Sequence, residues 1–166
     1  GNIMDFGFFF GFNSKRSIVE LYLPDNYTPA LQVDLTSGDL EFGDDFIFTG
    51  LDVKLTSGNI RSNHLIQVKD AKVVVSSGSI RFNNLATDTF FVKLTSGDVQ
   101  ADMMSGAGNI EVTSGDIKVS SLDLQGDMSI QVTSGNVKLF MAGDPGLDFT
   151  SKVTSGDIKT YLDLVY

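Results

Sequence analysis

The sequence predicts an all-β, single-domain parallel β-solenoid, right-handed, with about seven coils of ~20 residues each. Three observations carry this prediction. A tetrapeptide of the type Thr-Ser-Gly-Asp recurs seven times, apolar residues alternate with other residues on both sides of it, and the repeat region holds no sustained 3.6-residue period. A chain of 166 residues with 42% hydrophobic content has enough apolar side chains for one sizeable core.

The tetrapeptide marks a corner of each coil. Its glycines are separated by 20, 20, 19, 18, 20 and 21 residues, so one unit recurs almost to the C-terminus. Gly tolerates positive φ, and the Asp, Asn or Ser beside it can bond to nearby backbone groups, so the chain is expected to turn there. The predicted corner glycines are Gly38, Gly58, Gly78, Gly97, Gly115, Gly135 and Gly156.

Apolar columns on both sides of the corners predict the core. Alternation with period two indicates strands with one buried face, and the β-branched side chains suit a pleated surface. Two predicted inward columns precede the corner and one follows it: Val33, Val53, Val73, Val92, Ile110, Ile130; Leu35, Leu55, Val75, Leu94, Val112, Val132, Val153; and Leu40, Ile60, Ile80, Val99, Ile117, Val137, Ile158.

The two ends are expected to cover the solenoid. Residues 1–32 form a Phe-rich segment and a capping strand that ends at Pro24, and residues 33–166 form the repeats and a closing strand. The phenylalanines between Phe6 and Phe12 either complete the cap or contact a partner. At the other end, Tyr161 and Tyr166 are expected to close the core.

Composition excludes several function classes. A net charge of −9 argues against nucleic acid as a partner, and no apolar stretch reaches the ~20 residues of a membrane-spanning helix. Without Cys there is neither a thiolate metal site nor a Cys nucleophile. The single histidine, His64, excludes a multi-histidine metal site and is expected on the surface or in a loop. No cofactor is expected.

Two outward columns supply the candidate site residues. The residue after each corner glycine is mostly Asp or Asn, and two positions further on the residue is mostly Lys or Arg. One interpretation makes Asp98 and Asp116 cation ligands and lets Lys118, Lys138 and Lys159 bind an acidic glycan. The structural alternative is that Asp and Asn bond to corner amides while the cations neutralise them.

The repeats also carry a family resemblance. Corners such as "VTSGDIKV" at residues 112–119, preceded by a strand such as "VELYLP", resemble a bacterial adhesin family of β-solenoid proteins, a domain of unknown function. The resemblance covers roughly residues 17–160. It implies an extracytoplasmic or cell-surface location and a link to envelope stress, and it supplies no catalytic residues.

Two functions from different classes follow. The first is a non-catalytic envelope module, monomeric or weakly oligomeric, that binds a protein or a glycan or acts as a spacer. The alternative is a carbohydrate-active β-helix enzyme, a lyase or hydrolase, acting on an acidic polysaccharide. Such enzymes build clefts from long loops between coils, whereas the intervals here vary only from 18 to 21 residues. We therefore expect the chain not to be an enzyme.

Overall fold

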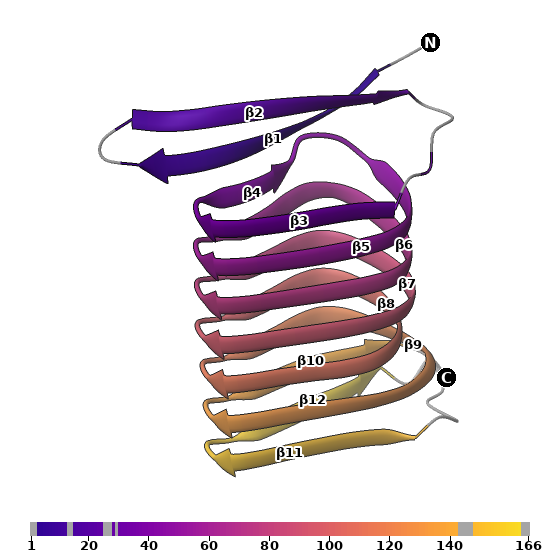
Figure 1. Cartoon of the computed structure of the whole chain (residues 1–166). Coiled ribbons are helices and arrows are strands. Elements are labelled where there is room, and N and C mark those ends of the chain that lie inside the picture. Colours follow the sequence, from indigo (N-terminus) through magenta and orange to yellow (C-terminus); the bar gives the residue numbers. More distant parts are fainter. Residues whose placement is uncertain (1–2, 13–14, 25–27, 29, 143–147, 164–166) are drawn as a thin grey trace.

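The described part of the chain is a single twelve-stranded β-sheet coiled into a solenoid (Figure 1). The structure is a computed structural model that describes residues 3–12, 15–24, 28, 30–142 and 148–163, with side chains for 28, 30–142 and 148–162. The strands are β1 (Ile3–Phe12), β2 (Lys15–Pro24), β3 (Ala30–Ser37), β4 (Asp39–Phe42), β5 (Phe46–Ser57), β6 (Ile60–Ser77), β7 (Ile80–Ser96), β8 (Val99–Ser114), β9 (Ile117–Ser134), β10 (Val137–Ala142), β11 (Phe149–Ser155) and β12 (Ile158–Asp163).

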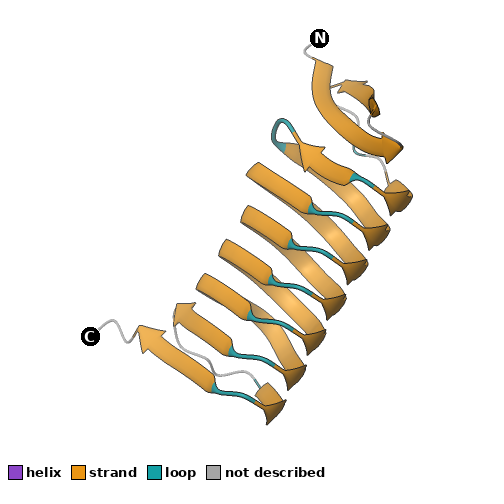
Figure 2. Cartoon of the chain, turned by 90° about the vertical axis from the view of Figure 1, so that its left-hand side faces the viewer, coloured by secondary structure: helices purple, strands orange, loops and turns teal. Residues whose placement is uncertain are grey.

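Each inner coil is one long strand between two sharp corners. We call the residues that follow a corner glycine the post-corner half and those that lead to the next glycine the pre-corner half. In Figure 1 the pre-corner halves run from right to left at the front, and the post-corner halves return from left to right behind them. Because the chain descends as it makes these turns, the solenoid is right-handed, as predicted. Seven corners delimit about six complete turns, and Figure 2 shows the corners stacked in one row.

The predicted inward columns form the core. Their members are buried along the stack, and Leu40, Val53 and Leu94 are completely so. The two exceptions lie in the last coil, where Val153 is half-buried and Ile158 is 39% exposed. Among the described residues no strand packs beyond β11 and β12, so these inward side chains have a neighbouring coil on one side only.

Local register shifts explain the unequal intervals. Between β6 and β7 the pairing shifts between Ser62 and Leu65, whose partners are Phe82 and Asn84, so two residues of β6 face one residue of β7. The next coil is shorter by one residue for this reason. A second shift, between Ala86 and Thr89 of β7, shortens the following coil in the same way. Such bulges adjust coil length while the corners stay aligned.

The N-terminal hairpin covers the edge of the first coil. Strands β1 and β2 pair antiparallel, and β1 also pairs antiparallel with β4, from Phe6 opposite Phe42 to Phe9 opposite Asp39. Figure 1 shows this hairpin above β3 and β4. The expected strand that ends at Pro24 is confirmed as β2. What the phenylalanine side chains of β1 contact lies outside the described side chains.

The expected role of Tyr161 is wrong. Tyr161 lies on the outer surface, 44% exposed, and its ring stacks on Phe140 of the preceding coil. The reason is the alternation of β12: Ile158 takes the inward position, and Tyr161 pairs in register with the outward Phe140. Tyr166 lies outside the described residues.

The corners require glycine for two reasons. Gly115 has a φ of 139°, which L side chains rarely adopt, and a Cβ built on it would overlap the backbone oxygen of Gly97 in the coil above. The corner backbones are also hydrogen bonded to one another: Gly115 donates to the Ser134 carbonyl at 2.9 Å, and Ile117 donates to the Asn136 carbonyl at 2.8 Å. Neighbouring corners therefore fit together only at this close approach.

We predict that Gly115→Ala destabilises the fold by at least about 3 kcal/mol, because the new Cβ meets both a forbidden φ and the Gly97 backbone. The matched control is Gly50→Ala, where the new Cβ would make ordinary contact with Ala30 at 3.8 Å. Urea unfolding followed by circular dichroism measures both variants. Equal transition midpoints for the two would contradict the steric account of the corners.

Candidate ligand-binding face

A column of long polar side chains runs down the post-corner halves. We define the basic column as Arg61, Arg81, Gln100, Lys118, Lys138 and Lys159; the same position in the first coil holds Glu41, which pairs in register with Arg61. Parallel pairing places each member directly beside the next. The spacing is therefore one side chain per coil, or ~4.8 Å. The five cations are exposed, and Gln100 is half-buried.

No carboxylate of the described side chains lies within ion-pair distance of the cations of this column. Among the described side chains, the ion pairs are His64–Asp45 at 3.7 Å and Lys93–Glu111 at 3.5 Å, and both lie elsewhere. Like charges placed side by side on a sheet are unfavourable. The column nevertheless holds five of the twelve Lys and Arg residues of a chain whose net charge is −9. It therefore concentrates positive charge on one line.

The corner column beside it is bonded to backbone. Asp98 accepts a hydrogen bond from the Asp116 N–H at 3.0 Å, and Asp116 accepts two from Asn136, from its N–H at 2.7 Å and from its amide Nδ2 at 3.0 Å. Asp39 accepts the same two bonds from Asn59. Each carboxylate thus ties its own corner to the next one down. Asp98 and Asp116, the predicted cation ligands, lie in adjacent coils. Each of them already accepts at least one hydrogen bond from the next corner.

The basic column has an arginine part and a lysine part. Arg61 and Arg81 line a hollow of about 530 Å³ whose other polar lining residues are Asn59, Asn63, Ser79, Asp98 and Gln100. Gln100 separates the arginines from the lysines in the column. Two guanidinium groups on neighbouring coils present planar forks of donors that suit carboxylate, sulfate or phosphate groups.

The lysine part adjoins an aromatic pair. The Phe140 and Tyr161 rings stack with centroids 4.6 Å apart and planes 12° from parallel. The Lys138 ammonium lies 5.3 Å from the Phe140 centroid and 5.8 Å from that of Tyr161, within cation–π range. The two rings border a groove of about 290 Å³ with Ser120 and Ser121 on its other side. Both serines face Phe140 because the β9–β10 pairing shifts between Leu139 and Met141.

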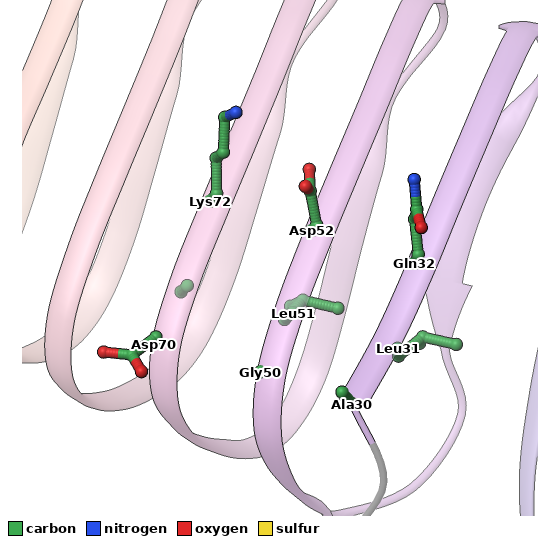
Figure 3. Close-up of a pocket in the computed structure, with 9 residues that line it drawn as sticks. Ala30, Leu31, Gln32, Gly50, Leu51, Asp52, Asp70 and Lys72 are labelled. Atoms are coloured by element: carbon green, nitrogen blue, oxygen red, sulfur yellow. The ribbon is translucent and has the colours of Figure 1, made fainter.

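A second hollow lies on the pre-corner halves of the first coils (Figure 3). Its volume is about 430 Å³, and Ala30 and Gly50 contribute little side-chain bulk to its lining. Gln32, Asp52 and Lys72 stand in a row in this view, and Asp70 lies below Lys72. Asp70 already accepts a hydrogen bond from Thr89 at 2.6 Å. This hollow carries mixed charges rather than a repeated one.

His64 is the residue whose surroundings the sequence did not reveal. Its Nδ1 lies 3.7 Å from a carboxylate oxygen of Asp45, and Asp44 offers a third possible ligand atom, all within 4.8 Å of one another. The signal was available, because residues 44 and 45 lie about one coil before residue 64. All three side chains are solvent-accessible, and Asp45 also accepts a hydrogen bond from the Leu65 N–H.

These features define a parallel β-solenoid protein with regular surface columns. The chain belongs to the Toastrack DUF4097 family, whose family model matches residues 2–164. This family is a domain of unknown function, so the adhesin resemblance stays a prediction. No curated protein and no solved structure matches the chain. In the described part of the chain, no helix is long and apolar enough to span a membrane.

We predict that Asp116→Ala destabilises the protein by about 1 kcal/mol, because both hydrogen bonds from Asn136 lose their acceptor. Asp123→Ala is the control: Asp123 is an exposed acid of β9, the strand that follows this corner, and its change is expected to stay within about 0.5 kcal/mol. Thermal unfolding of both variants gives the comparison. If both lose the same stability, the corner carboxylates do not tie the coils together.

Proposed function

We propose that this chain is a non-catalytic binding module of the cell surface or envelope that holds an acidic glycan along its basic column. The observation that carries the proposal is the stack of Lys118, Lys138 and Lys159 in three adjacent coils, where no described carboxylate pairs with them. Lysine offers only donors, and the backbone carbonyls within a parallel sheet are already used by its own ladder. The ammonium groups are thus available to an outside acceptor.

The regular spacing favours a polymer over a small molecule. A single exposed pair between an ammonium and a carboxylate contributes only about 0.2–1 kcal/mol. A polymer that carries many acidic groups meets several cations at once, and the later contacts form at a high effective concentration. Repeated weak contacts along the solenoid therefore add up, whereas one small anion would bind weakly.

The shape of the coils supports a binding role over a catalytic one. Lyases and hydrolases on β-helices place their carboxylates in clefts made by long loops. Here the described inner coils pass from strand to strand through tight corners, and the hollows beside the basic column are bordered by strand and corner residues. The corner carboxylates are engaged with backbone N–H groups.

The proposed ligand also favours the proposed location. Acidic polysaccharides are components of cell surfaces and their surroundings, so a protein that binds them is expected on the outer side of the membrane. A role in envelope stress, which the adhesin resemblance implies, fits a module that senses or holds such polymers. The basic column is formed by a single chain, so the proposal is the same for a monomer and for a weak oligomer.

The test compares two triple variants with equal charge change. Lys118→Gln/Lys138→Gln/Lys159→Gln removes the lysine part of the basic column, and Lys54→Gln/Lys93→Gln/Lys152→Gln removes three exposed lysines of the pre-corner halves. We predict that the full chain binds immobilised polygalacturonate and that only the first triple reduces the affinity, by about tenfold. Added salt should weaken binding of the unchanged chain.

Two results would overturn the proposal. If both triples reduce binding equally, net charge and not the column determines the interaction. If the unchanged chain binds neither polygalacturonate nor a sulfated polysaccharide such as heparin at low salt, the basic column is not a site for acidic glycans. Unfolding curves of the variants show that each remains folded during the comparison.

A further inference from the structure

We infer that the glycan is a linear polyuronate, with one carboxylate on each sugar, that lies parallel to the solenoid axis across Lys118, Lys138 and Lys159. This inference rests on the proposed function and narrows its ligand to one chemical class. It depends on two features of the lysine part of the column: the spacing of the charges and the stacked rings of Phe140 and Tyr161.

The charge spacing matches one acidic sugar per coil. The three lysines repeat every ~4.8 Å, because successive coils pair in parallel and in register. A pyranose ring in an extended polysaccharide advances its chain by about the same distance. A polyuronate aligned with the axis therefore brings one acidic ring to each coil, and the long, flexible lysine side chains reach carboxylates that successive rings turn to different sides. A glycan with an acidic group on every second sugar would leave alternate lysines empty.

Other common polyanions fit this spacing less well. An extended acidic peptide advances ~3.4 Å per residue, so its residues fall out of step with coils that are ~4.8 Å apart. A nucleic-acid strand in a duplex carries a phosphate every ~3.4 Å, and the excess negative charge of this protein would repel it. The match is closest for a polymer whose unit is one charged ring.

The aromatic pair supplies a surface for a sugar ring. Sugars present C–H bonds on their faces, and these pack against aromatic rings. Tyr161 is 44% exposed, and Ser120 and Ser121 line the same groove as its ring. Lys138 lies near both rings, within 5.8 Å of their centroids, while its side chain remains exposed. A uronate bound here places its ring against the exposed side of Tyr161 and its carboxylate at a lysine.

The experiment measures how the affinity of the full chain depends on oligomer length and charge spacing. Calorimetric titration uses galacturonate oligomers from the dimer to the hexamer, hyaluronan oligomers with an acid on alternate sugars, and polyglutamate. We expect affinity to rise steeply up to the trimer or tetramer, and hyaluronan oligomers of equal length to bind more weakly. Tyr161→Ala should weaken galacturonate trimer binding by about fivefold. Phe91→Ala, a half-buried outward aromatic of the pre-corner halves, should leave it unchanged.

The outcomes separate this inference from the proposed function. If polyglutamate or hyaluronan binds as tightly as polygalacturonate and the lysine triple still abolishes binding, the column binds acidic polymers in general and the polyuronate inference is wrong. If Tyr161→Ala and Phe91→Ala have equal effects, the aromatic pair is not a sugar surface. If no polyanion binds at low salt, the inference and the proposed function both fail.

Discussion

The structure depends on the close stacking of glycine corners. All seven corner glycines have a positive φ, and a Cβ built on any of the six that follow Gly38 would overlap the backbone of the corner glycine in the preceding coil. Backbone hydrogen bonds of 2.8 to 3.0 Å then join neighbouring corners along the stack. Because the corners fix where each coil starts, bulges elsewhere change the length of a coil without moving its columns out of line.

The shared register has different consequences for side chains of different chemistry. Inward apolar columns become a continuous core. Outward Asp and Asn can accept bonds from the backbone N–H groups of the next corner, so they strengthen the stack that aligns them. The Lys and Arg side chains of the basic column have no ion-pair partner among the described side chains, so the same alignment gathers their charge on one line. One geometric constraint thus produces an internally satisfied column beside one that suits an external anion.

Much of this fold could be predicted from the sequence because the repeat exposes its own register. Seven glycines at nearly equal intervals locate the corners, and period-two apolar positions such as Leu40 and Ile60 identify the core. The unique parts were not accessible in this way. Whether Tyr161 points inward or outward depends on the strand phase in the last coil. For His64 the spacing of about one coil from Asp45 was a signal, but the residues around it do not repeat between coils, so the sequence alone did not determine the contact.

The most direct test of the account is to map the bound ligand by nuclear magnetic resonance of the isotope-labelled full chain titrated with galacturonate oligomers. The account predicts that the perturbed signals follow the axis of the solenoid, in the post-corner halves of adjacent coils around Lys118, Lys138 and Lys159, and include Tyr161. Perturbations confined to the opposite half, for example around Gly50 and Lys72, would contradict the claim that the stacked corners build the binding column.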